Sequence, residues 1–193
     1  STFSGASINA DSAAVYIEGG TPTIQNSTFS SNSIGIYNQG NPTISNNTFT
    51  NVPGLFNTYA VKLNLVSATL SGNTATNNTY NGTFLEGAVT QNTTLQADTM
   101  PYIMNSFTVQ TGKTLTLQAG VIVKFVKTSS DPPAELVVNG TLLANGTSGS
   151  KVVFTAADDN TVGGTGTSTV ATPHWKWIRF PLGGTGNLQN TVV

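Results

Sequence analysis

Cysteine, charge and long hydrophobic runs are what this chain of 193 residues has least of. It contains no cysteine, which excludes disulfide bonds and thiolate metal sites. Only 8% of its residues are charged and its formal net charge is -1, so no basic face is available for nucleic acid or anionic lipid. No apolar run approaches the ~18–20 residues that a membrane-spanning helix needs. We therefore expect no nucleic-acid partner, no membrane span and no cofactor.

Small polar residues take the place of the missing charge. Thr, Ser, Asn and Gly together make up roughly half of the chain, well above ordinary usage. Disordered chains can share this composition, but they lack the regularly spaced Ile, Leu, Val and Phe that recur along this one. The polar, Lys-poor makeup suits an outer surface better than a cytosol. The composition thus predicts a folded, extracellular or cell-surface protein.

A short pattern occurs twice near the N-terminus. The segments 19–30 and 39–50 match each other, and Pro22, Ile24 and Phe29 recur as the same residue types one period later. The spacing of about twenty residues is typical of solenoids. Each copy holds two short β-prone runs separated by Asn, and such runs are stable only when they pair with the equivalent runs of neighbouring copies.

Stacking of the copies predicts columns of equivalent side chains. Ile24 should lie over Ile44, and Phe29 over Phe49, in apolar columns. We also predict a hydrogen-bonded amide ladder at the bend between the two runs. The ladder is expected to contain Asn26, Asn46 and Asn190.

The rest of the chain follows the same plan less regularly. Residues 61–74 are interpreted as a third copy, with Leu65 in the place of Ile44 and Leu70 in that of Phe49. We treat 1–193 as one unit with two textures. These are short-period Asn/Thr-rich coils over 1–101, and regular coils over 102–193 that carry protruding loops at 127–133 and 158–173.

Three segments resemble one known family. Residues 112–125 (GKTLTLQAGVIVKF) are similar to the "GxTLTIxPGvvvKF" segment of secreted right-handed parallel β-helix proteins, and 136–142 and 177–180 continue in that family's order. The resemblance implies an all-β, right-handed parallel β-helix of the pectate-lyase-like superfamily. From the period we expect roughly eight to nine coils of ~20–22 residues. The scaffold serves lyases, hydrolases, adhesins and fibres, so it does not decide the function.

Neither end of the sequence has a helix-like or charged cap, and we expect the coils to continue past both. Residues 183–193 align with 19–29, so that Val193 corresponds to Phe29 and joining Val193 to Ser1 gives an uninterrupted coil. This predicts a head-to-tail junction. Its residues are Ser1, Thr2, Phe3, Leu188, Asn190, Val192 and Val193.

Catalytic chemistry has little support in the residues. β-Helices that cleave polysaccharides need clustered carboxylates, and here only Asp158 and Asp159 are adjacent. A structural role is the preferred interpretation, and a Ca²⁺ site that also uses Asp131 is the alternative. The single histidine, His174, and the single arginine, Arg179, stand in no catalytic motif. We predict no catalytic residue, no metal site and no enzyme.

Two further kinds of site are considered. Trp175 and Trp177 share one face of a strand and could stack on sugar rings, although packing in the core is favoured. Candidate N-glycosylation sites follow the Asn-x-Ser/Thr pattern outside the predicted ladder. They are Asn77, Asn81, Asn92, Asn139 and Asn145.

These observations favour a structural function. The expected protein is a repeating unit of an extracellular filament or a long surface protein, and its partner is a further copy of itself, joined head to tail. The alternative is a carbohydrate-binding or adhesin module with glycans as partners. A polysaccharide lyase or hydrolase ranks third, because the carboxylate cluster is missing.

Overall fold

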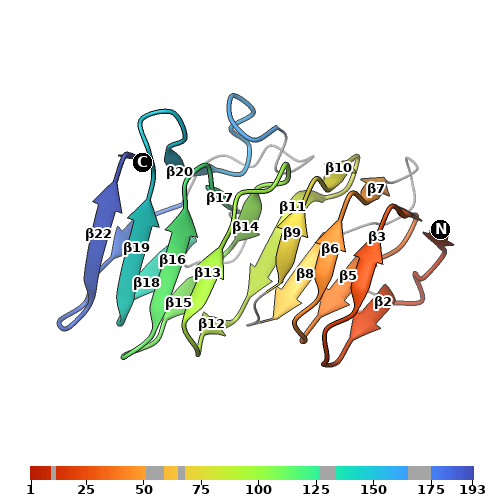
Figure 1. Cartoon of the computed structure of the whole chain (residues 1–193), viewed down its shortest axis with the longest axis horizontal. Coiled ribbons are helices and arrows are strands. Elements are labelled where there is room, and N and C mark those ends of the chain that lie inside the picture. Colours follow the sequence, from red (N-terminus) through yellow and green to blue (C-terminus); the bar gives the residue numbers. More distant parts are fainter. Residues whose placement is uncertain (10–11, 51–58, 65–67, 127–133, 165–174) are drawn as a thin grey trace.

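The structure is a computed structural model that describes residues 1–9, 12–50, 59–64, 68–126, 134–164 and 175–193. These residues contain no helix, and all pairings between their strands are parallel. The strands stack in successive coils along one long axis, with the termini near opposite ends of the molecule (Figure 1). The architecture is therefore a parallel β-helix, as predicted.

One sheet runs the whole length of the molecule. Sheet B receives one strand from every coil, eight in the described residues. Its strands are β2 (Ala13–Ile17), β5 (Ile34–Asn38), β8 (Tyr59–Asn64), β11 (Tyr80–Glu86), β14 (Tyr102–Met104), β17 (Ile122–Phe125), β20 (Val152–Ala156) and β23 (Thr191–Val192).

Two short sheets complete the N-terminal coils. A coil there runs through sheet C, a tight corner, sheet A and then sheet B. The strands of sheet C are β3 (Thr23–Gln25), β6 (Thr43–Ser45) and β9 (Thr69–Ser71). Those of sheet A are β1 (Thr2–Ser4), β4 (Thr28–Ser30), β7 (Thr48–Thr50) and β10 (Thr74–Thr76).

The C-terminal coils have a different cross-section. They lack a sheet A strand and instead place a sheet D strand between sheets B and E. Sheet D contains β12 (Ala88–Val89), β15 (Phe107–Val109), β18 (Glu135–Val138) and β21 (Trp177–Arg179). Sheet E contains β13 (Thr93–Leu95), β16 (Thr114–Gln118), β19 (Thr141–Asn145) and β22 (Thr185–Gln189). Sheets C and E lie along the same side of the molecule (Figure 1).

The predicted apolar columns are confirmed for the first two copies. Ile24 pairs with Ile44, and Phe29 with Phe49. The ring of Phe29 is stacked between those of Phe3 and Phe49, at centroid distances of 4.9 and 4.8 Å. Each fully buried aromatic or aliphatic side chain contributes about 1.5–3 kcal/mol, so the columns are a main source of stability.

The third copy differs from the prediction. Leu70 pairs with Ile44 rather than taking the place of Phe49, and that place is filled by Ala75. Leu65 lies outside the described residues. Both β6 and β9 consist of Thr, an apolar residue and Ser, and the two strands pair in the register of this shared pattern. Gly72 therefore stands at the position of Asn46. The period is also uneven: Asn47 bonds to Ser27, 20 residues earlier, and to Asn73, 26 residues later.

The amide ladder lies one residue later than predicted. The side-chain oxygen of Asn47 accepts from the Ser27 N–H (3.0 Å), and that of Asn73 accepts from the Asn47 N–H (3.1 Å). The side-chain nitrogens of Asn47 and Asn73 donate to the carbonyls of Ile24 and Ile44, and Asp98 receives the next bond of the ladder from Asn73. The ladder fills the inside of the corner, where its amides are buried.

The residues predicted for the ladder serve as corners instead. Asn26, Asn46 and Asn190 are exposed and have φ values of 52, 53 and 44°. Asn is one of the few non-glycine residues that adopts this left-handed conformation readily, because its short side chain can bond locally. The prediction thus located the bend correctly but placed the ladder on the corner residue, one position before the residues that form it.

Candidate functional site

The adjacent carboxylates have a structural environment. The carboxylate of Asp159 accepts hydrogen bonds from the Thr155 hydroxyl (2.6 Å) and from the N–H (2.9 Å) and hydroxyl (2.6 Å) of Thr161. These bonds, that of Thr155 first, lower the pKa of Asp159 to about 2. No group of three metal-ligating side chains occurs in the described part of the chain. Asp131, the proposed third Ca²⁺ ligand, and His174 lie outside it.

Lys124 holds the segment that follows β20 against sheet B. Its side chain is fully buried, and its ammonium donates to the carbonyls of Asp159 and Gly164, each at 2.5 Å. Burial lowers the pKa of Lys124, whereas the negative charges of Asp159 and Asp158 oppose this shift. Residues 158–164, part of the loop predicted to protrude, are therefore fastened over the sheet.

The outer face of sheet B carries a row of aromatic side chains that the sequence analysis missed. Tyr16 and Tyr37 stack at 5.4 Å, and Tyr59 and Tyr80 at 5.0 Å. The ammonium of Lys62 lies 5.1 Å from the Tyr37 ring and 5.3 Å from the Tyr59 ring, so it joins the two pairs. We call Tyr16, Tyr37, Tyr59, Lys62 and Tyr80 the aromatic row.

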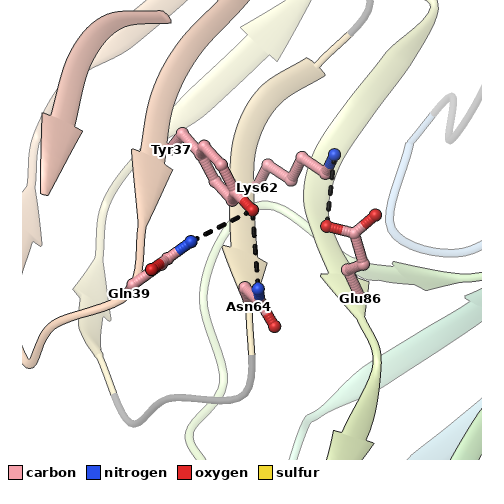
Figure 2. Close-up of polar contacts among 5 residues, drawn as sticks. All are labelled: Tyr37, Gln39, Lys62, Asn64 and Glu86. Atoms are coloured by element: carbon pink, nitrogen blue, oxygen red, sulfur yellow. Dashed lines mark hydrogen bonds and ion pairs between the residues drawn. The ribbon is translucent and has the colours of Figure 1, made fainter. Parts of the chain in front are cut away.

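Polar groups border the aromatic row (Figure 2). The Tyr37 hydroxyl accepts from the side-chain nitrogens of Gln39 (3.3 Å) and Asn64 (3.5 Å), and Lys62 forms an ion pair with Glu86 at 3.2 Å. The rings of each pair stack on one another, and Tyr16 is exposed whereas Tyr37, Tyr59 and Tyr80 are half-buried. Such a surface can hydrogen-bond a polar ligand but offers no nucleophile paired with a base.

A sequence signal for this row did exist. The runs Val-Tyr-Ile-Glu-Gly at 15–19 and Ile-Tyr-Asn-Gln-Gly at 36–40 directly precede the two copies of the repeat. Their alternation places Tyr16 and Tyr37 on one face, opposite Val15 and Ile36. Lys62 could not be aligned in the same way, because the spacing between coils changes before β8.

The two tryptophans do not share an environment. Trp175 stacks on Phe125 at 4.5 Å and packs against the core, as the favoured interpretation had it. Trp177 is 42% exposed on sheet D, and its indole N–H donates to the Glu135 carboxylate, which also pairs with Arg179 at 3.4 Å. The bond from Trp177 is the main reason why the pKa of Glu135 is lowered. Glu135, Trp177 and Arg179 form the Trp177 cluster.

The glycosylation candidates differ in accessibility. Asn77, Asn92 and Asn145 are exposed, and Asn139 is half-buried. Asn81 is buried, and its side-chain oxygen accepts from both the main-chain N–H (2.9 Å) and the side-chain nitrogen (3.1 Å) of Asn78. In the folded protein the side chain of Asn81 is therefore poorly accessible.

The core columns reach both ends of the described molecule. Leu188 continues the column of Leu117 and Ala144 but is 42% exposed. At the other end, Phe3 caps the stack of phenylalanine rings and is half-buried. The expected equivalence of Val193 and Phe29 is wrong, because β4 lies in sheet A whereas β23 pairs with β20 in sheet B.

Comparison with known proteins gives one match. Residues 1–100, just over half of the chain, match the family described as right handed beta helix region. The chain belongs to the right-handed β-helix family. This agrees with the parallel sheets and with the resemblance noted in residues 112–180. No curated protein and no solved structure matches the chain.

Membership of the right-handed β-helix family does not decide whether the protein is a catalyst. The family includes both enzymes and proteins without catalytic activity. The candidate surfaces on this β-helix are the aromatic row, the Trp177 cluster and the two ends of the core columns. Among the described residues there is also no helix of the length and hydrophobicity needed to cross a bilayer.

Proposed function

We propose that this β-helix is a structural unit of an extracellular filament or a long surface protein, in which coils of one unit stack on coils of the next. The observation that carries the proposal is the repeated corner at the two ends. At both places a strand is followed by an Asn with a left-handed backbone. Asn190 (φ 44°) follows β22, which contains Leu188, and Asn26 (φ 52°) follows β3, which contains Ile24.

The stacking would extend two sheets. Sheet E would continue into sheet C of the next copy, with Leu188 over Ile24, and β23 would lie beside β2 in sheet B. Leu188 and Ile24 occupy inward positions, so the contact would bury apolar surface that the unit leaves exposed. Within this chain, coils with sheets A and C are followed between β10 and β12 by coils with sheets D and E. A change from one kind of coil to the other is therefore compatible with a continuous core.

The test compares two leucine variants of sheet E. Leu188→Lys places a charge in the proposed contact, whereas Leu143→Lys places one on the lateral face of the preceding coil. We expect light scattering and electron microscopy at rising concentration to show end-to-end particles for the unchanged chain and for Leu143→Lys, and single units for Leu188→Lys. A chain that stays monomeric throughout, or a Leu188→Lys variant that assembles normally, contradicts the proposal.

The Trp177 cluster supports a second candidate, a carbohydrate-binding module. An exposed indole next to a carboxylate and a guanidinium combines a stacking surface with hydrogen-bonding groups for sugar hydroxyls. The Lys176 ammonium lies 3.9 Å from the centroid of the same ring. A glycan array probed with the unchanged chain and with Trp177→Ala tests this function. Loss of binding in Trp177→Ala supports it, and absence of binding to any glycan removes it.

A further inference from the structure

Sheet A presents an unusual outer face. In each of its strands the middle residue points into the core, and the two flanking residues point outward. All eight outward residues are Thr or Ser. They are Thr2, Ser4, Thr28, Ser30, Thr48, Thr50, Thr74 and Thr76, here called the hydroxyl array.

The hydroxyl array is a regular lattice in two directions. The four strands pair in register without a bulge, which aligns the hydroxyls in two straight columns. Neighbouring strands lie about 4.8 Å apart, and two residues along a strand span about 6.7 Å. The hydroxyl oxygens of Thr48 and Thr74, and those of Thr50 and Thr76, are 3.5 Å apart.

The array is also rigid and accessible. Six of the eight residues are Thr, which is branched at Cβ and has few rotamers on a strand, so their methyl and hydroxyl groups keep their places; the other two are Ser4 and Ser30. Phe3, Phe29 and Phe49 anchor the strands from inside through their stacked rings. The outward residues are exposed or half-buried. The lattice is therefore formed before any ligand arrives, which reduces the entropic cost of binding.

No other described sheet has such a face. Sheet C interrupts its Thr/Ser columns with Gln25, sheet E with Leu143, and sheet D carries Glu135 and Trp177. The outer face of sheet B carries the aromatic row and the charges of Lys62 and Glu86. Within the described part of the chain, an outer face made entirely of Thr and Ser is confined to sheet A.

The chemistry of the array selects a class of ligand. A face without charge does not attract nucleic acid or charged polysaccharide, and a face without an outward ring gives sugars nothing to stack on. At its β10 end the array borders a pocket, which Thr74 and Thr76 line together with Asn81, Gly163 and Gly164; no residue of β1, β4 or β7 lines that pocket. A periodic set of donors, acceptors and methyl groups instead complements a periodic, uncharged solid that forms hydrogen bonds.

We propose that the hydroxyl array binds ice. The threonine hydroxyls would hydrogen-bond to waters of the crystal surface, and the adjacent methyl groups would hold waters between the columns in an ordered arrangement. The uncharged face matches the uncharged lattice, and adsorption there would slow the growth of the crystal. This activity does not depend on stacking of units and would belong to the single β-helix.

The experiment uses the whole chain and two threonine variants. Thr48→Lys puts a long charged side chain in the middle of the hydroxyl array, and Thr69→Lys makes the same change at the equivalent strand position in sheet C. Partitioning into slowly grown ice and inhibition of ice recrystallisation are measured for each. We expect the unchanged chain and Thr69→Lys to enter ice, and Thr48→Lys to be reduced by about tenfold or more.

Circular dichroism and thermal unfolding confirm that both variants are folded, so a loss in Thr48→Lys alone reports on the surface. The proposal is overturned if the unchanged chain is excluded from ice like an ordinary soluble protein. It is equally overturned if Thr48→Lys partitions as the unchanged chain does. Sedimentation with powdered crystalline cellulose or chitin, without activity on ice, would assign the array to a polysaccharide surface and also overturn it.

Discussion

Neighbouring asparagines in the N-terminal coils have different physical roles. Asn46 is exposed and supplies the left-handed backbone of the corner, whereas Asn47 is buried and its side chain bonds to an N–H and a carbonyl of the preceding coil. The same corner contains Gly72 in the next coil, where a left-handed residue is again required. Conformation is therefore what the first position needs, and hydrogen-bonding capacity is what the second needs.

This difference predicts opposite tolerance to substitution. Asn47→Ala leaves the Ser27 N–H and the Ile24 carbonyl without their partners in a buried corner, and we expect a loss of ~2–4 kcal/mol in unfolding free energy. Asn46→Gly keeps the left-handed conformation accessible and should cost at most a few tenths of a kcal/mol. Denaturant unfolding of both variants measures this. Equal losses would show that the ladder is not the stabilising element.

Asp159 predicts a dependence of stability on pH. Its folded-state pKa is lowered from 3.8 to about 2, so the unfolded chain binds the proton first as pH falls. The stabilisation is fully present above about pH 4 and is lost as pH falls through about 2. Unfolding free energies measured across this window should fall less steeply for Asp159→Asn than for the unchanged chain. Asp158→Asn is the control for removal of one charge, and it should keep the steep decline.

The individual residues show where sequence reasoning succeeds. A period of twenty residues is enough to place Ile24 on Ile44 and Phe29 on Phe49, because inward apolar residues can be recognised by type alone. It does not separate Asn46 from Asn47, because the two roles use the same residue type. Nor could it find the clamp formed by Lys124, whose partners are main-chain carbonyls of a loop 35 and 40 residues later.

The strand β5 fits closely against its neighbours. Gly35 is its second residue, and an added Cβ there would approach the Ala60 carbonyl to 2.5 Å and the Phe49 ring to 2.6 Å. The ring of Phe49 is held in the phenylalanine stack and the carbonyl belongs to the adjacent strand, so neither can move freely. A glycine here allows sheet B to pass close to the column of sheet A.

Gly35→Ala should therefore destabilise the protein by ~1–3 kcal/mol through overpacking. Gly19→Ala is a suitable control, since no atom lies within 4 Å of its added Cβ and its backbone is not left-handed. Thermal unfolding of the two variants distinguishes them. If Gly35→Ala melted at the temperature of the unchanged chain, the close approach of β5 to Phe49 and Ala60 would be wrong.

The register of the strands could be predicted only where the spacing is constant. The shift from a spacing of 20 to one of 26 residues after Asn47 is what misplaced Leu70, because an apolar residue alone does not reveal which of two short runs it belongs to. The exchange of sheet A for sheet D was not predicted either. Both kinds of strand have the same short alternating pattern, so the pattern alone does not tell which sheet a strand joins.

At the scale of the whole molecule, the exchange of sheets divides one continuous β-helix into two kinds of coil. In a solenoid each coil contacts only its neighbours, so overall cooperativity depends on every interface between coils. Sheet B crosses the exchange without interruption, whereas sheets A and C end before it and sheets D and E begin after it. The coils on the two sides of this boundary are therefore joined by strand pairing in fewer sheets than any other neighbouring coils in the described part of the chain.

Packing at this boundary is incomplete. A cavity of about 20 Å³ lies there, lined by residues from both kinds of coil. Its lining consists of Leu63, Leu85, Ala88, Val89, Thr93, Leu95, Phe107 and Leu115. Nearly all of these side chains are apolar, and an apolar cavity of this size forgoes the dispersion contacts that filled space would provide.

This boundary should be where the molecule first loses cooperativity. We expect calorimetry of the unchanged chain to show a calorimetric enthalpy larger than the van't Hoff value, because the two sets of coils unfold partly independently. Val89→Ile adds one methylene next to the cavity and should stabilise the protein by ~0.5–1 kcal/mol while bringing the two enthalpies closer together. Val138→Ile, at a fully buried position of sheet D away from the cavity, should not stabilise it, because no space receives the methylene. A single two-state transition in the unchanged chain, or equal effects of the two substitutions, would mean that the exchange of sheets does not weaken the helix.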